Sequence, residues 1–391
     1  MNIMKSFKLF ALALAAMTSF AACSSDDDDN NNENGNESGN VVADGTTLKG
    51  IISSDVTLKA GYSYKLSGEY IVEDGATLNI EAGVKITAIY DDIVDYILVK
   101  QGGKINAVGT ASAPIVMTSE KEEPGAWGGI HICGKAHTNA EGGKGSSEIG
   151  GATYGGNDDA DNSGTLQYIR LEYTGYAFNE EKEANGISFY GVGSGTTVDH
   201  CQAYKGSDDG FEFFGGSVNV SNMVVVSCSD DSFDWTEGWN GKGTDLVAYQ
   251  EASTTLGYDC DCLIEADNNE NNYAATPVSH PVLKNLILAG NGGSKQGIRL
   301  RRGTQVEIDN AKVCGKGKTL AVESKETEDA LKNGTSKLTN ITLSNALDSK
   351  ESIYTNDTFT AAGNKVDTSL AYASFDAIKA ECSWMSGNWV K

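Results

Sequence analysis

Several common features are missing from this chain of 391 residues. After the first 22 residues, no apolar stretch approaches the roughly 20 residues that a membrane-spanning helix needs, so the sequence predicts no further transmembrane helix. Basic residues are few, 30 against 54 acidic ones, and the net charge of −24 disfavours nucleic acid and anionic membrane surfaces as partners. No nucleophile motif, P-loop or dinucleotide fingerprint occurs, so we expect no organic cofactor and leave the catalytic residues unknown.

Cysteine is present in a number and spacing that favour neither a complete set of disulfides nor zinc. Apart from Cys23, seven cysteines remain, and an odd number cannot all pair within one chain. Cys260 and Cys262 are too close in sequence for the usual zinc knuckle, and no second pair accompanies them. We therefore expect several of the seven to be small buried apolar residues.

Residues 1–22 have the pattern of a signal peptide. Lys5 and Lys8 precede an apolar run at 9–20, and small residues then lead into Cys23. Residues 19–23 resemble a lipobox, whose cysteine is acylated and becomes the first mature residue. The resemblance implies firm anchoring by several acyl chains, palmitate among them. An ordinary signal peptide, cleaved just before an unmodified cysteine, is the alternative.

Residues 23–44 are predicted to be an acylated cysteine followed by a flexible acidic tether. They contain almost nothing apolar before Val41, so they cannot bury enough surface to offset their conformational entropy. The tether opens on an acidic run: Ser25, Asp26, Asp27, Asp28 and Asp29. This run resembles the export signal of Bacteroidetes surface lipoproteins, which implies a lipid-anchored, surface-exposed protein of the outer membrane. A plain solvated charge run is the alternative.

Residues 45–391 are predicted to form a single all-β domain. The chain holds 46 glycines, and short β-rich runs such as 77–80 and 97–99 recur between glycines and polar turns. Six residues from Gly186 align with those from Gly210 and then with those from Ser232, at offsets of 24 and 22 residues. A coil of this length with about three short strands is typical of a parallel β-helix. The predicted fold is a right-handed parallel β-helix, a single-stranded solenoid with loop insertions.

The repeat also assigns side chains to the inside and the outside of the coils. Because neighbouring side chains along a strand point to opposite faces, one set stacks in the core. The residues expected inside are Ile187, Phe189, Phe211, Phe213, Phe233 and Trp235. The residues between them then point outward.

Acidic residues stack on the outside of two adjacent coils. Glu212 and Asp234 would point outward one coil apart, and two Ser-Asp-Asp turns would stack beside them. Such carboxylates repel one another, and protonation, basic partners or bound Ca²⁺ would relieve the repulsion. The alternative is a solvated turn whose aspartates accept local backbone N–H groups. The candidate metal-binding residues are Asp208, Asp209, Glu212, Asp230, Asp231 and Asp234.

Arginines and aromatic residues suggest where a ligand would bind. The chain has only four arginines, and three of them lie at 299–302. Two of these share an outer face, where they either clamp a carboxylated ligand or pair with the protein's own acids. An aligned aromatic face suits stacking on sugar rings, although the insertions at 138–163 and 266–276 would cover part of it. The candidate ligand-binding residues are Tyr190, Phe214, Trp239, Arg299 and Arg301.

Short motifs along residues 45–391 resemble a poorly characterised family of secreted bacterial β-helix proteins. These motifs include residues 75–80 and 107–110 in the opening coils, 127–130, and an ending with Trp384 and 387–389. The resemblance implies one β-helix domain and a surface location, and it implies no catalytic residues. Pectate lyases share the general scaffold, which is an analogy of fold only.

Three functions are compatible with these patterns. The leading prediction is a non-enzymatic surface adhesin or glycan-binding protein, whose partner is a polysaccharide or host glycan. The second is a polysaccharide lyase or hydrolase that uses Glu212 and Asp234, with Arg299 or Arg301 as the base of a lyase. The third is a structural component of a surface layer or matrix.

Overall fold

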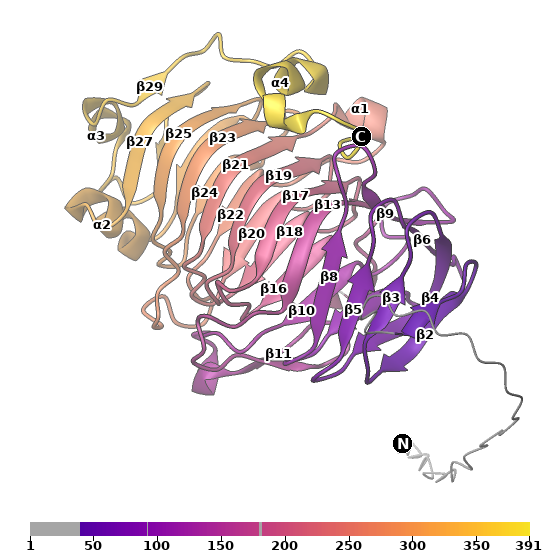
Figure 1. Ribbon diagram of the computed structural model, residues 1–391. Helices are drawn as coiled ribbons and strands as arrows, with labels where there is room; N and C mark the ends of the chain where they lie inside the picture. Colours follow the sequence, from indigo (N-terminus) through magenta and orange to yellow (C-terminus); the bar gives the residue numbers. More distant parts are fainter. Residues whose placement is uncertain (1–39, 92, 180–181) are drawn as a thin grey trace, which may run out of the picture. The chain divides into compact units, whose positions relative to one another are not determined.

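The computed structural model describes residues 40–91, 93–179 and 182–391 (Figure 1). Cys23 and the acidic run 25–29 lie outside the described residues, so the anchor and the export signal stay predictions. No helix in the described ranges is long and apolar enough to cross a membrane.

The predicted right-handed parallel β-helix is confirmed. Within the described residues, twenty-five strands join one sheet in which successive coils pair in parallel, and the sheet winds around the core as three faces. The first face contains β1 (Asn40–Val42), β3 (Val56–Leu58), β5 (Thr77–Ile80) and β8 (Lys104–Val108). The second contains β6 (Lys85–Ala88), β9 (Ile115–Ser119) and β29 (Lys365–Val366).

The third face carries the site described below. Its strands are β7 (Tyr96–Val99), β10 (Ile130–Cys133), β16 (Ile187–Tyr190), β18 (Phe211–Phe214), β20 (Phe233–Thr236), β22 (Ile264–Ala266), β24 (Gln296–Leu300), β26 (Lys318–Val322) and β28 (Asp348–Ser349). Each of these strands pairs with the next coil, so equivalent positions form straight columns.

Longer strands run across two faces. The strands β2 (Thr47–Ile52) and β4 (Ser63–Val72) join the second face to the third. Those joining the first face to the second are β13 (Gly164–Glu172), β17 (Thr197–Tyr204), β19 (Asn219–Val226), β21 (Lys242–Tyr249), β23 (Val282–Ala289), β25 (Glu307–Cys314) and β27 (Lys337–Leu343).

The bend in each of the seven strands that join the first face to the second lies at one residue with positive φ. These corner residues are Tyr168, His200, Asn222, Asp245, Asn285, Asn310 and Asn340. Asparagine and aspartate tolerate this left-handed conformation better than other non-glycine residues, which accounts for five of the seven.

The core has the composition that the repeat predicts. Ile187 pairs in register with Phe211, and Phe211 with Phe233. The Phe189 and Phe213 rings stack with centroids 5.1 Å apart. The six residues expected inside are all buried, and so are the seven cysteines of the described residues, which are all free thiols. The expectation that several cysteines pack as apolar residues is therefore confirmed.

One predicted boundary is wrong. Strand β1 lies within residues assigned to the tether, and its backbone pairs in parallel with β3. The domain therefore begins before residue 45. The tether was predicted from the scarcity of apolar residues, but pairing with β3 satisfies the backbone of Asn40–Val42 without a large apolar side-chain surface.

Insertions and terminal segments cover parts of the coils. The insertion after β10 contains η1 (Glu141–Gly143) and the hairpin of β11 (Gly145–Ser146) and β12 (Thr153–Tyr154). A second hairpin pairs β14 (Ala177–Asn179) with β15 (Lys182–Glu183). The helices are α1 (Ser253–Leu256), α2 (Lys325–Asn333), α3 (Asn356–Ala361), α4 (Phe375–Glu381) and η2 (Ser383–Met385).

Candidate functional site

A cleft lies on the outer side of the third face, over β18, β20 and β22. It consists of two adjoining pockets of about 330 Å³ and 720 Å³, which share Glu148, Glu212 and Asp234. All six candidate metal-binding residues line the smaller pocket, together with Glu148, Glu183, Asp261, Glu265 and Arg299. We call these eleven residues the acidic cleft.

The stacking of coils brings the carboxylates together. Ser188, Glu212, Asp234 and Glu265 occupy one outward column, as the repeat predicted for the first three. Because adjacent parallel strands lie about 4.8 Å apart, like residues in one column are necessarily close. The column therefore concentrates negative charge that a single coil could disperse into water.

Two of the five candidate aspartates bond the backbone of the next coil. Asp209 accepts the N–H of Asp231 at 2.8 Å, and Asp231 accepts the N–H of Cys262 at 2.6 Å. This part of the solvated-turn alternative is correct, although the acceptors serve a neighbouring coil and are buried. Glu212 accepts the amide of Asn185 at 2.6 Å. By contrast, Asp234 Oδ1 is buried without a hydrogen-bond partner among the described residues.

Burial and mutual repulsion keep these carboxyl groups protonated to unusually high pH. Burial, then the neighbouring Asp230, raises the pKa of Asp208 to about 9. Burial raises the pKa of Glu148 to about 7, with Glu183 and Glu237 adding to the effect. The pKa values of Glu212 and Asp234 also lie well above their ordinary values, mainly through burial. Near neutral pH the cleft therefore holds protons, unless a cation replaces them.

The carboxylate geometry fits a hard cation. Oxygen atoms of Asp209, Glu212 and Asp234 all lie within 4.8 Å of one another, as do those of Glu183, Asp208 and Asp230. Ligands at the usual 2.3–2.6 Å from one Ca²⁺ ion lie at most about 5 Å apart. These oxygen-only groups suit calcium better than zinc, which prefers nitrogen and sulfur.

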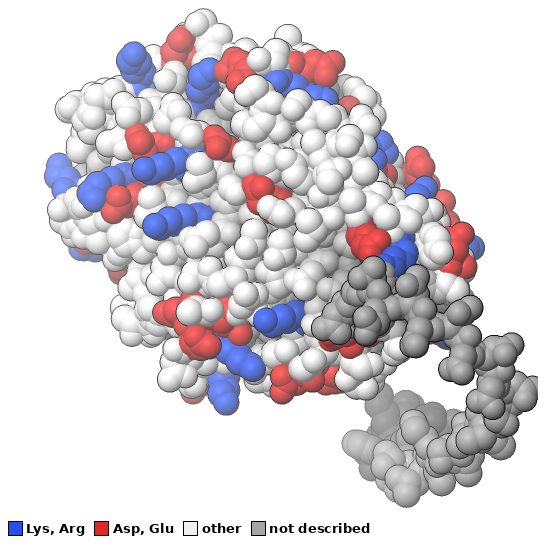
Figure 2. Space-filling model, in the orientation of Figure 1, with Lys and Arg blue, Asp and Glu red and all other residues white. Residues whose placement is uncertain are grey.

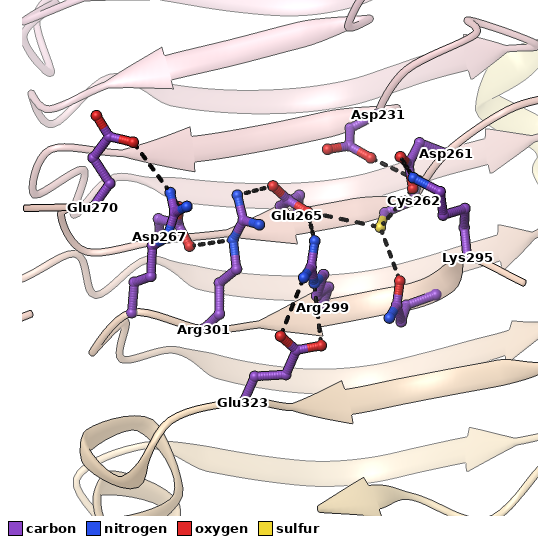
Figure 3. A network of polar contacts seen from close by, with 12 residues as sticks. Asp231, Asp261, Cys262, Glu265, Asp267, Glu270, Lys295, Arg299, Arg301 and Glu323 are labelled. Carbon is purple, nitrogen blue, oxygen red and sulfur yellow. Dashed lines mark hydrogen bonds and ion pairs between the residues drawn. The ribbon is translucent and has the colours of Figure 1, made fainter. Parts of the chain in front are cut away.

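The arginines at the next coils are occupied by acids of the protein itself (Figure 3). Arg299 donates to Glu265 at 2.9 Å and to Glu323 at 3.2 Å. Arg301 donates to Asp267 at 2.7 Å and also pairs with Glu265. Of the two alternatives for Arg299 and Arg301, pairing with the protein's own acids agrees with the structure. The ligand clamp does not, because carboxylates already take up their guanidinium groups.

The predicted aromatic binding face is wrong in this structure. Tyr190 is fully buried, with its ring 4.5 Å from Phe214 and 5.1 Å from Tyr154 of the insertion after β10. Trp239 lies in the core, stacked at 4.1 Å on Phe213. The insertion covers the outward rings, and the turn after β20 directs the tryptophan inward. Phe214 alone of the three still lines the larger pocket.

The sequence analysis missed four carboxylates of the cleft. Glu148 and Glu183 come from the two inserted hairpin regions, where no repeat offset applies. Glu265 is in register with Asp234, but a longer connection joins β21 to β22, so the offset of 22 residues fails there. Asp261 lies in that same loop. An alignment that allowed variable loop lengths would have found only Glu265.

The matching family model agrees with the fold. The family model described as a pectate-lyase like beta helix domain matches residues 50–391. The crystal structure of the Dettilon tailspike protein is similar over 76% of this chain, with 9% sequence identity and a TM-score of 0.28. The match covers 56% of the tailspike chain, a little over half its length. No curated protein matches the sequence.

Proposed function

Because the chain belongs to the family of pectate-lyase-like β-helix domains, we propose that it is a surface lipoprotein that binds a polysaccharide or host glycan in the acidic cleft. The observation that carries the proposal is the cleft itself. It extends over several coils between two insertions and is lined by polar groups, as an extended, hydroxyl-rich ligand requires. The ligand is bound and not converted in this proposal.

Calcium is part of the proposal. A Ca²⁺ ion held by the Asp209, Glu212 and Asp234 group would receive the buried and otherwise unpartnered Asp234 Oδ1 as a ligand. It would also reverse the repulsion within the column. The ion would then offer open coordination positions to sugar hydroxyl or carboxylate oxygens.

The test is thermal unfolding of the full chain in calcium and in chelator. Calcium should raise the melting temperature, and the rise should grow with the logarithm of its concentration, since only the folded state holds the ion. The rise should vanish in Glu212→Gln/Asp234→Asn, which changes two of the three proposed ligands, and persist in Glu326→Gln, an exposed control outside the cleft. A melting temperature indifferent to millimolar calcium and to chelator would contradict the metal proposal.

Glycan binding is tested separately, on an array probed with the full chain. Binding should require calcium and should be lost in Glu212→Gln/Asp234→Asn but not in Glu326→Gln. A chain that binds no glycan, and that assembles into layers or matrix, would favour the structural alternative.

One observation favours hydrolysis as a second candidate. Carboxyl oxygens of Glu212 and Asp234 lie within 4.8 Å, and burial raises the pKa of both groups. A retaining glycosidase needs an acid and a carboxylate about 5–5.5 Å apart. New reducing ends from a polysaccharide panel, abolished in Glu212→Gln, would support it. A lyase is less suitable, because Arg299 and Arg301 are held in ion pairs and burial among carboxylates leaves neither free to accept a proton.

The lipid anchor and the acidic export signal are tested in cells. Cys23→Ala should release the protein from membranes. Replacing Asp26–Asp29 with alanine should protect the protein from protease added to intact cells, if the acidic run directs surface display. Equal cleavage of the wild type and the variant would contradict that role.

A further inference from the structure

A third pocket, of about 260 Å³, lies on the outer side of the second face. Its floor is formed by β21, β23 and β25, which contribute Asp245, Asn285 and Asn310 at the strand corners. Its wall is the C-terminal segment from α4 to η2, with Trp384 at the rim. None of these residues belongs to the acidic cleft.

The tryptophan at this pocket is held in place before any ligand arrives. Trp384 stacks against Trp389 with centroids 6.1 Å apart and an interplanar angle of 29°. The edge of His200 packs on it at 6.3 Å. The indole is half-buried, so part of the ring still faces the pocket. A large ring that is already ordered loses little conformational entropy when a flat, weakly polar ligand surface stacks on it.

The floor opposite the tryptophan presents ordered polar groups. Asn310 donates to Asn285 Oδ1 at 2.8 Å, and Asn285 donates to Asp245 Oδ1 at 3.0 Å. These bonds orient the side chains, and each amide has a second N–H that they do not use. The left-handed corner conformation explains why asparagine or aspartate stands at these positions. It does not explain why an ordered tryptophan lies across from them.

The charges around the pocket favour a neutral, hydroxyl-rich ligand. Lys312 is paired with Glu381 at 2.6 Å, so its charge is already balanced. Asp245 accepts from an amide and contributes a carboxylate that can accept from hydroxyl groups. An anionic ligand would be repelled, whereas adjacent sugar hydroxyls both donate and accept.

We propose that this pocket is a second carbohydrate-binding site, which takes one neutral sugar residue. Trp384 stacks on the face of the sugar ring, while Asp245, Asn285 and Asn310 bond its hydroxyl groups. This site needs no calcium and is independent of the function proposed for the acidic cleft. A chain with both sites would hold two points of a branched glycan, or two separate chains.

The test measures binding of single neutral sugars to the full chain in the presence of chelator. Glucose, galactose, mannose and N-acetylglucosamine are titrated at millimolar concentration, with saturation-transfer NMR and tryptophan fluorescence as readouts. At least one sugar should bind saturably. Asn285→Gly should weaken that binding about tenfold, the equivalent of one lost hydrogen bond to a polar ligand, and Trp384→Ala should abolish it.

The controls separate this site from the fold and from the cleft. Asn340→Gly makes the same change at a corner outside the pocket, and glycine accepts the positive φ at both positions. Binding should be unchanged in Asn340→Gly and in the cleft variant Glu212→Gln/Asp234→Asn. The proposal is overturned if none of the four sugars binds, or if Asn285→Gly behaves like Asn340→Gly. If Trp384→Ala fails to fold, the comparison of Asn285→Gly with Asn340→Gly decides by itself.

Discussion

Two neighbouring stretches of the third face share one backbone geometry and differ in charge. In the first stretch, β18 and β20, Glu212 is in register with a second acidic residue, Asp234. In the second stretch, β22 and β24, Glu265 is in register with Arg299 and forms an ion pair with it at 2.9 Å. Figure 2 shows acidic and basic side chains interspersed over much of the face in view, which resembles the second stretch.

The comparison teaches what a parallel β-helix does to outward side chains. Every residue type that recurs from coil to coil becomes a column with a spacing of about 4.8 Å. At an effective dielectric constant of 20, two unit charges at that spacing interact by about 3.5 kcal/mol, before screening by water and salt. Opposite charges thus form a network as in the second stretch. Like charges form a region that is stable only with protons or a cation, which is why we place function in the first stretch.

The largest expected effect tests the core beneath the first stretch. Phe211→Ala should lower the free energy of unfolding by about 3–5 kcal/mol, because the ring is fully buried. On the outer side, Phe214→Ala should cost about 2–3 kcal/mol, since the insertion leaves that ring only 9% exposed. Urea melts of both variants measure the difference. A negligible cost for Phe214→Ala would show that the insertion does not cover it in solution.

The second prediction breaks the network of the second stretch. Arg301→Ala removes one of two basic partners from Glu265, which keeps Arg299, and one from Asp267, which keeps Arg302. Because both carboxylates are largely buried, the loss should cost about 2 kcal/mol. In the first stretch, Asp234→Asn in chelator should change stability in the opposite direction, because asparagine is neutral without binding a proton, whereas the buried Asp234 must take one up. A stabilised Arg301→Ala variant would contradict the view that the opposite charges of this network stabilise the fold.

The third prediction separates the stretches by pH. The folded protein holds protons on Asp208 and Glu148, whose pKa values are raised to about 9 and about 7, while the unfolded chain releases them near pH 4. Without calcium, this contribution to stability is complete below about pH 4 and is lost as the pH rises towards about 9. Urea melts in chelator at pH 5 and pH 8 should therefore differ by at least about 1 kcal/mol, the value of one pKa unit.

Two variants test which groups cause this slope of the unfolding free energy against pH. Asp208→Asn should flatten it, whereas Glu326→Gln should leave it unchanged. Calcium should also flatten it, because the ion replaces the protons. A stability that rises between pH 5 and pH 8 in chelator would mean that the cleft carboxylates are ionised and stabilised by other groups.

The smallest effect is expected for an exposed ion pair beside the second stretch. Lys318 and Asp348 form an ion pair at 2.7 Å beside the second stretch, but both side chains are about half exposed. Lys318→Ala should change the free energy of unfolding by less than about 0.5 kcal/mol, since water screens such pairs. A cost near that of Arg301→Ala would show that exposure does not separate the two kinds of pair.

The sequence by itself determined the repeat and everything that follows from it locally. Alternation along a strand assigned Phe211 to the core and Glu212 to the outside, and the offset of 22 residues placed Asp234 beside it. These inferences succeed because the two faces of a strand and the stacking of equal coils depend only on neighbouring residues and a constant coil length.

Only the tertiary structure decided which outward residues meet solvent. The burial of Tyr190 under an inserted hairpin, the inward turn of Trp239 and the arrival of Glu148 in the cleft depend on how irregular segments pack on the coils. Insertions follow no period, so their contacts join residues that no local pattern relates. The ion pair between Arg301 and Asp267 could likewise not be predicted. A long loop lies between the two residues in the sequence, so no constant offset relates them.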